Sequence, residues 1–332
     1  MELKNNYLIE HPIFILNSPR SGSTLLRLIL NSNSKISIPN EFILVEKIIT
    51  TFSNNDEISK KAAIDFINKI SDLKKFKDWN IDVGKLITKA NENNFYTRNH
   101  LIQLIYSFYT KQYNGKKVWG DKNIHSLSYL KDIVSIFPEA RFIHIVRDGR
   151  DVALSLKKVG WLFYKFPTKK RHYINNIKGC ALTWNDSLEL IEENEHLFDS
   201  NNFIEINYEF LVKEPKKALN SLCSFLKIDF EDKMLDFHEN NSISKERLAL
   251  THKNTKKPIL KDNFNKYLKF LSKNEIQIFE HYSSKMLLKY GYEINFNKED
   301  LSKVKIILNN IKYLINFNVI YFLFKVKSYV KN

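Results

Sequence analysis

The residues with the clearest chemical capacity form a short polar loop near the N-terminus: Arg20, Ser21, Gly22, Ser23 and Thr24. The glycine lets the backbone approach an anion closely, the hydroxyls add hydrogen-bond donors, and the arginine adds a planar charged fork that suits an oxyanion. The apolar run Ile13–Leu16 before the loop predicts a buried strand, and the Leu/Ile-rich run after it predicts a helix. A loop at a helix N-terminus presents unpaired N–H groups and the positive end of the helix dipole. The pattern therefore predicts a phosphate-binding loop.

This loop differs from the loop that binds nucleoside triphosphates. The triphosphate signature, G-x-x-x-x-G-K-[ST], has a lysine after its second glycine that reaches the β and γ phosphates. In this chain Ser23 and Thr24 follow Gly22, and that lysine is missing. The loop therefore suits a single phosphate that bears a leaving or transferring group better than it suits a triphosphate. The alternative is an ordinary strand-to-helix turn with polar caps.

A second strand, charged turn and helix follow later in the chain. The segment 140–146 predicts a buried strand, Arg147–Asp151 a charged turn, and the residues that follow a helix containing Ser155. Two such units separated by helices are typical of a doubly wound parallel sheet, whose ligands bind at the carboxyl ends of the strands. We therefore expect an α/β fold of the P-loop type flanked by helices, with Arg20 and Arg147 at the same edge of the sheet.

The remaining hydrophobic patterns predict the elements around this sheet. We expect extended segments at 36–42, 118–123 and 202–208, and helices at 42–52, 126–137, 160–201 (most clearly 180–195), 215–225 and 273–290. Residues 53–115 predict a helical insertion, and the polar segment 240–265 predicts a long loop over the site. The simplest division is one domain over residues 1–300, followed by a helical tail over 301–332.

Composition limits the function less than the motifs do. The formal net charge of +15 is compatible with nucleic acid, an anionic membrane surface, an acidic acceptor or a polyanionic cofactor, and the lysines are scattered rather than grouped. Cys180 and Cys223 lie far apart and form no C-x-x-C pair, which suits a reducing compartment. The N-terminal residues also lack the pattern of a signal peptide. We therefore expect a cytoplasmic protein.

The C-terminal tail mixes apolar residues with lysine and asparagine. Its longest uninterrupted apolar run, Val319–Phe324, is too short to span a bilayer. We favour a helix that packs on the core or forms an oligomer. The alternative is peripheral membrane contact, by a helix that lies on a membrane interface.

Taken in order, these segments resemble the sulfotransferases that use 3′-phosphoadenosine 5′-phosphosulfate (PAPS), and in particular the tyrosylprotein sulfotransferase-like branch. The resemblance runs from about residue 12 to residue 292, and it is carried by the segments 19–24, 121–122, 141–151, 206–209 and 288–292. A single loop of this kind would be a weak sign, whereas the ordered set is specific to the family.

The resemblance implies PAPS as co-substrate, no metal, and a role for each matching residue. Arg20 and Ser21–Thr24 would bind the 5′-phosphate and sulfate oxygens. Arg147 and Ser155 would bind the 3′-phosphate, and Tyr208 would pack near the nucleotide.

The polar loop over the site is the least regular part of the resemblance. Related enzymes carry a basic residue there that closes on the 3′-phosphate, and Lys257 is the best candidate, with Lys256 next to it. The segment Asn265–Ser272 stands where related enzymes often have Gly-Arg-Trp.

Sulfuryl transfer needs an activated hydroxyl and stabilisation of the charge on the departing phosphate. The resemblance implies that Glu41 is the general base and that Lys122 and Arg20 neutralise this charge. We therefore expect transfer to a hydroxyl acceptor, such as a glycan, a peptide tyrosine or a small molecule, and no nucleic acid partner. The alternatives are a P-loop-related kinase or nucleoside triphosphatase, and an anion- or nucleic-acid-binding module that only the charge supports.

Overall fold

The computed structural model describes residues 11–52, 57–112, 116–159, 163–165, 171–239, 257–294 and 303–329. The chain divides into two compact units. Unit 1 comprises residues 1–17, 22–145 and 194–261, and unit 2 comprises residues 18–21, 146–193 and 262–332.

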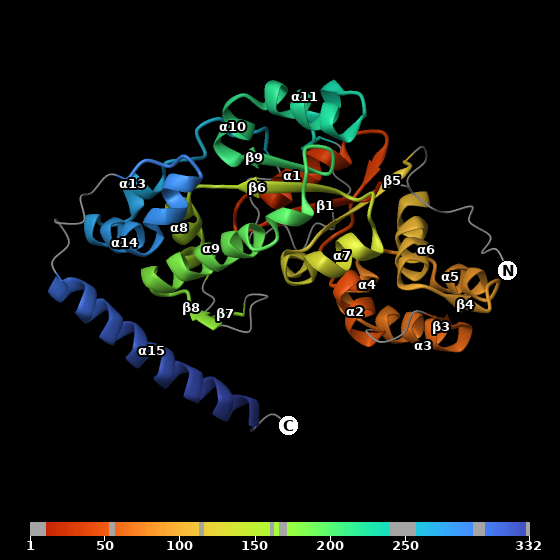
Figure 1. Ribbon diagram of the computed structural model, residues 1–332, viewed down its shortest axis with the longest axis horizontal. Coiled ribbons are helices and arrows are strands. Elements are labelled where there is room, and N and C mark those ends of the chain that lie inside the picture. The colour runs from red at the N-terminus through yellow and green to blue at the C-terminus, as the bar shows by residue number, and fades with distance from the viewer. Residues whose placement is uncertain are drawn as a thin grey trace. The chain divides into compact units, whose positions relative to one another are not determined.

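Unit 1 is built on a five-stranded sheet with the order β2-β5-β1-β6-β9. Figure 1 labels four of these strands, β1, β5, β6 and β9. Its strands are β1 (Ile13–Asn17), β2 (Ile36–Ser37), β5 (Val118–Lys122), β6 (Arg141–Val146) and β9 (Phe203–Asn207). β1 pairs in parallel with β5 and β6, and β2 pairs in parallel with β5. Asn17 is aligned with Ile145, so β1 and β6 end at the same edge of the sheet. The predicted α/β fold with a doubly wound parallel sheet is confirmed.

The central strand is buried on both faces, which explains its continuous apolar run. The Phe14 ring stacks on Phe142 of β6 at 5.6 Å between centroids and meets the edge of Trp119 of β5 at 5.8 Å. Aromatic side chains near the beginnings of three adjacent strands therefore form one packed layer that holds these strands together.

The helices of unit 1 follow the hydrophobic spacing in the sequence. They are α1 (Ser23–Asn31), α2 (Leu44–Thr51), α3 (Lys60–Ser71), α4 (Lys74–Lys77), α5 (Val83–Ala90), α6 (Arg98–Lys111), η1 (Ile124–Tyr129), α7 (Leu130–Ile136), η2 (Glu195–Leu197), α10 (Tyr208–Lys213), α11 (Pro215–Leu226) and η3 (Asp232–Met234). Within 57–112 the chain also forms an antiparallel pair that was not predicted, β3 (Ile58–Ser59) with β4 (Phe95–Tyr96).

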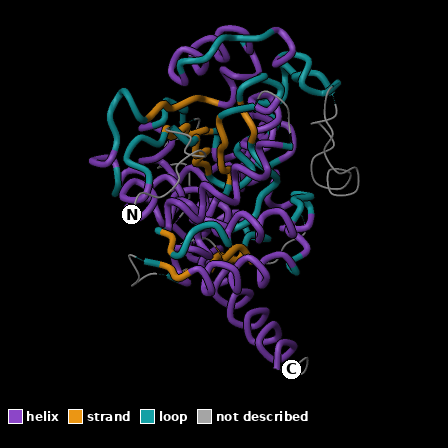
Figure 2. Tube along the Cα trace, turned by 90° about the vertical axis from the view of Figure 1, so that its right-hand side faces the viewer, coloured by secondary structure: helices purple, strands orange, loops and turns teal. Residues whose placement is uncertain are grey.

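Unit 2 is mainly helical. It contains α8 (Gly149–Lys158), α9 (Ile177–Glu192), α13 (Tyr267–Phe270), α14 (Lys273–Lys289) and α15 (Lys303–Tyr329). α9 packs against both α8 and α14, and a Cβ atom on Gly149 would come within 2.6 Å of the Trp184 and Phe279 rings. The first residue of α8 must therefore be glycine for these rings to pack as closely as they do. Figure 2 shows α15 as one continuous helix at the C-terminal end of the chain.

Two helix predictions are wrong in part. The segment 126–137 is a 3₁₀ helix, η1, followed by the short helix α7. The segment 160–201 is not helical throughout, because β7 (Phe163–Lys165) and β8 (Arg171–Tyr173) form an antiparallel pair. α9 begins only after Asn176, whose side chain caps it. Most of the predicted loop 240–265, including Lys256, lies outside the described residues.

Candidate active site

The predicted phosphate loop connects β1 to α1. Gly22 caps α1 from a left-handed backbone conformation, with a φ of 96°, and Arg20 also has a positive φ of 66°. Ser21 is fully buried, and its hydroxyl is hydrogen-bonded to that of Ser18. The chain therefore turns sharply after β1 and presents the first N–H groups of α1, as an anion-binding loop requires.

Tyr208 explains why the loop needs glycine at position 22. A Cβ atom on Gly22 would lie 2.3 Å from Cδ2 and 2.5 Å from Cε2 of the Tyr208 ring, closer than any real contact. Tyr208 is buried and begins α10, which the Asn207 side chain caps. The ring that was predicted to pack near the nucleotide thus packs against the backbone of the loop.

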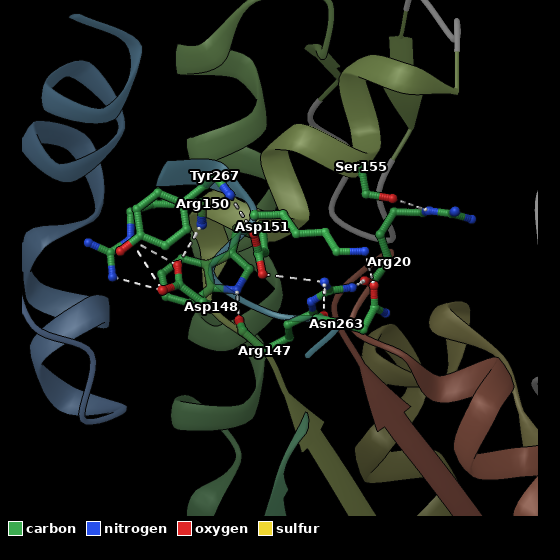
Figure 3. Close-up of polar contacts among 10 residues, drawn as sticks. Arg20, Arg147, Asp148, Arg150, Asp151, Ser155, Asn263 and Tyr267 are labelled. Carbon is green, nitrogen blue, oxygen red and sulfur yellow. Dashed lines mark hydrogen bonds and ion pairs between the residues drawn. The ribbon is translucent and has the colours of Figure 1, made fainter. Parts of the chain in front are cut away.

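Unit 2 brings Arg20, Arg147 and Ser155 together (Figure 3). The Arg20 Nε donates a hydrogen bond to the Ser155 hydroxyl at 3.0 Å, and the Arg147 Nη1 donates to the Arg20 carbonyl at 3.5 Å. Ser155 was expected beneath Arg147, and the side chain that it contacts here is that of Arg20. The turns after β1 and β6 are therefore neighbours, as the sequence predicts.

Two further residues lie beside Arg147 that the sequence reasoning missed. The Arg147 Nη2 donates to the Asn263 carbonyl at 3.0 Å, and the Lys266 Nζ donates to the Asn263 side-chain oxygen at 2.5 Å. Burial, and then the positive charge of Arg147, lower the pKa of Lys266. The sequence held one sign of this role for Lys266: Lys266 and Tyr267 stand where related enzymes often have the Arg and Trp of Gly-Arg-Trp. Lys257, the residue predicted for this role, is exposed in unit 1.

The second arginine of the turn after β6 has a structural role. Arg150 is 2% exposed, and its Nη2 lies 2.7 Å from a carboxylate oxygen of Asp148, while its Nη1 pairs with Glu280. Its guanidinium also lies 4.3 Å from the centroid of the Tyr267 ring. Burial alone would lower the pKa of Arg150, but its hydrogen bonds and ion pair with Asp148 raise it. Arg150 therefore holds the turn and the start of α13 in place, whereas Arg147 lies beside Arg20.

Unit 1 pairs Glu41 with Lys122, two residues that are 81 positions apart in the sequence. Lys122 ends β5 and its side chain is 9% exposed, and its Nζ lies 2.6 Å from the Glu41 carboxylate, which is 38% exposed. Burial alone would raise the pKa of Glu41, but Lys122, with smaller contributions from Lys75 and His125, holds it below its ordinary value. The pair therefore combines an ionised, partly accessible carboxylate with a buried ammonium group.

Asp121, next to Lys122 in β5, is buried, and each of its carboxylate oxygens accepts a hydrogen bond from a hydroxyl group. The Tyr106 hydroxyl donates to one of its oxygens at 2.9 Å and the Ser126 hydroxyl to the other at 3.2 Å. Burial raises the pKa of Asp121 to about 6. These hydrogen bonds hold the end of β5 in place and so fix the position of the Lys122 backbone.

Two absences concern only the part of the chain that the structure describes. Within the ranges given above, no cluster of three or more His, Cys, Asp or Glu side chains could hold a metal ion. None of the helices over the same residues is long and apolar enough to cross a membrane.

Comparison with known proteins identifies the same family that the motifs indicate. A model described as the sulfotransferase family matches residues 12–232. Among curated proteins, the chain is 24% identical to protein-tyrosine sulfotransferase 1 of Danio rerio, over 91% of this chain and 78% of that protein. It is 23% identical to protein-tyrosine sulfotransferase A of Caenorhabditis elegans, over 88% of this chain and 70% of that protein. A match of 24% identity to an uncharacterized Aquifex aeolicus protein covers 69% of this chain and 27% of that protein.

Solved structures show the same fold. The sulfotransferase domain from the curacin biosynthetic pathway aligns with a TM-score of 0.57 and 20% identity, over 86% of this chain and 99% of that domain. The sulfotransferase domain of a Synechococcus olefin synthase aligns with a TM-score of 0.52 and 22% identity, over 83% of this chain and 96% of that domain. Because the family model covers both strand-turn-helix units and the Glu41 and Lys122 positions, the chain belongs to the sulfotransferase family.

Proposed function

We propose that this chain transfers the sulfuryl group of PAPS to a hydroxyl-bearing acceptor, with Glu41 as the general base. Membership of the sulfotransferase family supports the reaction type. The observation that carries the assignment of the base is the 2.6 Å contact between Glu41 and Lys122, because it joins an ionised carboxylate to a cation at the end of a sheet strand. Both are groups that sulfuryl transfer needs.

Each of the two units offers hydrogen-bond donors that suit a phosphate group. The start of α1 offers backbone N–H groups and a glycine without a side chain, which suit the 5′-phosphosulfate. Unit 2 gathers the cations Arg20 and Arg147, with Lys266 and the Ser155 hydroxyl beside them, which suit the dianionic 3′-phosphate. When bound, PAPS supplies the sulfuryl group and accepts the departing charge as adenosine 3′,5′-bisphosphate.

Lys122 acts in both steps of the proposed reaction: removal of the proton from the acceptor hydroxyl and departure of the phosphate from sulfur. The Glu41 carboxylate accepts the proton of the acceptor hydroxyl as the new bond from oxygen to sulfur forms, and a base so placed contributes about 10²- to 10⁴-fold to the rate. Lys122 stabilises the negative charge on the phosphate oxygen from which sulfur departs. As Lys122 turns toward that oxygen, its hold on Glu41 weakens and the carboxylate becomes a stronger base.

The acceptor is proposed only by chemical class. The names of the relatives support a peptide tyrosine as one candidate, and glycans and small alcohols are the others. Transfer of labelled sulfate from PAPS to a panel of peptides, glycans and small alcohols would identify the class.

The central test is the substitution Glu41→Gln. It should lower turnover by about 10²- to 10⁴-fold, because the amide cannot accept the proton, and it should leave the affinity for adenosine 3′,5′-bisphosphate within a few-fold of the unmodified chain. Glu46→Gln is the matched control, because this carboxylate lies on α2 and pairs with His125. Full turnover in Glu41→Gln would exclude Glu41 as the base. Absence of both bisphosphate binding and sulfate transfer in the unmodified chain would exclude the function itself.

A further inference from the structure

One face of α15 is attached to unit 2. Tyr313, on this face, is 7% exposed and lies beneath the Lys178 ammonium group. The Asn310 side chain accepts hydrogen bonds from the Lys178 Nζ and from the Tyr282 hydroxyl. These contacts reach α9 and α14, so the first half of α15 has a fixed rotation about its own axis.

The other face of α15 carries large apolar side chains that are exposed to between 48% and 67%. They are Ile307, Leu308, Ile311, Leu314, Ile315, Val319 and Phe322. At 3.6 residues per turn these positions fall within an arc of roughly 140°, and the centre of the arc lies almost opposite Tyr313. The same arc contains the exposed Asn318. Soluble surfaces expose single apolar residues routinely, but seven large apolar side chains exposed on one face of a helix, an apolar stripe, indicate a binding surface.

The charge of the segment indicates what this stripe binds. From Leu301 to the last residue the chain has no aspartate or glutamate and six lysines: Lys303, Lys305, Lys312, Lys325, Lys327 and Lys331. Two copies of the helix that paired through their apolar stripes would bring lysines together without acidic partners on either helix. An anionic lipid surface supplies the missing negative charge and a medium for the apolar side chains.

We propose that α15 lies on an anionic membrane surface, with its exposed apolar side chains in the outer part of the bilayer and with the net positive charge of the segment balanced by the lipid headgroups. No helix of the described residues is long and apolar enough to span a bilayer, so the helix lies in the plane of the interface. The attachment through Tyr313 and Asn310 then holds the rest of unit 2 at the membrane surface.

The experiment measures binding of the full chain to lipid vesicles by co-sedimentation. The chain should bind vesicles of phosphatidylcholine mixed with phosphatidylserine, bind vesicles of phosphatidylcholine alone much more weakly, and lose affinity as salt is raised. The triple variant Ile311→Gln, Ile315→Gln and Phe322→Gln should bind the mixed vesicles roughly a hundredfold more weakly, because half-exposed apolar side chains no longer gain from entering lipid.

A matched triple variant controls for the general loss of exposed apolar surface. Leu73→Gln, Phe210→Gln and Leu288→Gln remove exposed side chains outside α15 and should bind the mixed vesicles as the unmodified chain does. The proposal is overturned if the unmodified chain does not bind the mixed vesicles, or if both triple variants bind them equally well. It is also overturned if the unmodified chain is a dimer that ignores vesicles and the α15 variant is a monomer, because a second copy would then cover the stripe.

Discussion

Gly22→Ala is the most direct test of the phosphate loop, because two separate costs meet at this residue. The backbone has a φ of 96°, and a Cβ atom would lie 2.3 Å from the Tyr208 ring. A left-handed conformation costs an alanine about 1–2 kcal/mol, and forcing a buried ring to move costs about 1–3 kcal/mol. We therefore expect Gly22→Ala to lower the free energy of unfolding by roughly 2–5 kcal/mol, out of a total of about 5–15 kcal/mol.

The chain contains a glycine that isolates the first of these costs. Gly291 also has a positive φ, of 77°, but no heavy atom of the described residues lies within 4 Å of where its Cβ would stand. Gly291→Ala should therefore cost only the backbone strain of about 1–2 kcal/mol. The two free energies of unfolding, measured by urea denaturation, should differ by the cost of moving Tyr208.

A change at Tyr208 should remove that difference. Tyr208→Val deletes the two ring atoms nearest to the Gly22 position, and the Cγ atom that stands at 3.5 Å is at an ordinary contact distance. In a Tyr208→Val background, Gly22→Ala should therefore cost about as much as Gly291→Ala does, roughly 1–2 kcal/mol. If Gly22→Ala costs the same with and without the tyrosine ring, the packing explanation for glycine in this loop is wrong.

Three other predictions follow from the buried charges and the proposed phosphate contacts. Arg150→Met leaves the carboxylates of Asp148 and Glu280 buried without their cation, so the free energy of unfolding in urea should fall by roughly 3–5 kcal/mol, and a loss below about 1 kcal/mol would contradict this role. Because burial raises the pKa of Asp121 from 3.8 to about 6, the folded chain holds this proton more tightly than the unfolded chain does. The resulting stability is present at low pH and is lost as the pH rises to about 6. The free energy of unfolding of the unmodified chain should therefore fall by roughly 3 kcal/mol over this pH range, whereas that of an Asp121→Asn variant should not. Parallel pH profiles for the two proteins would contradict the assignment. Ser155→Ala should weaken the binding of adenosine 3′,5′-bisphosphate, measured by calorimetry, by about tenfold or more. It should leave the binding of adenosine 5′-monophosphate unchanged, because only the bisphosphate has a 3′-phosphate. Equal effects on both ligands would contradict a role of Ser155 at the 3′-phosphate.

The strands that carry the site were predictable because their signals are local. β1 and β6 are continuous apolar runs that end in charged turns, so their type, their boundaries and their shared edge follow from the sequence. The pair β7 and β8 was missed because each strand is only 3 residues long, too short for an alternating hydrophobic pattern to be recognised. Short strands depend on their pairing partner, and hydrophobic periodicity cannot detect that partner.

Some residues of the candidate site were also predictable from local sequence signals, and others were not. Arg20 and Arg147 follow predicted strands, so their proximity could be inferred from the topology. The contact of Tyr208 with Gly22 and the position of Lys266 depend on how distant segments pack, and no spacing in the sequence encodes either one. The family resemblance favoured Lys257 for the 3′-phosphate, and this assignment stays a prediction.

Arg20 combines two demands that other residues cannot meet together. Its positive φ of 66° favours glycine or asparagine, either of which would relax the backbone and give up the guanidinium that contacts Ser155. Lysine at position 20 would keep a positive charge but would lack the planar guanidinium with its several N–H donors. It would also have the same strained backbone conformation. Glycine or asparagine at this position would therefore lose the contact with Ser155, and lysine would keep the backbone strain. The contact between Arg20 and Ser155 is made only with a strained backbone at residue 20.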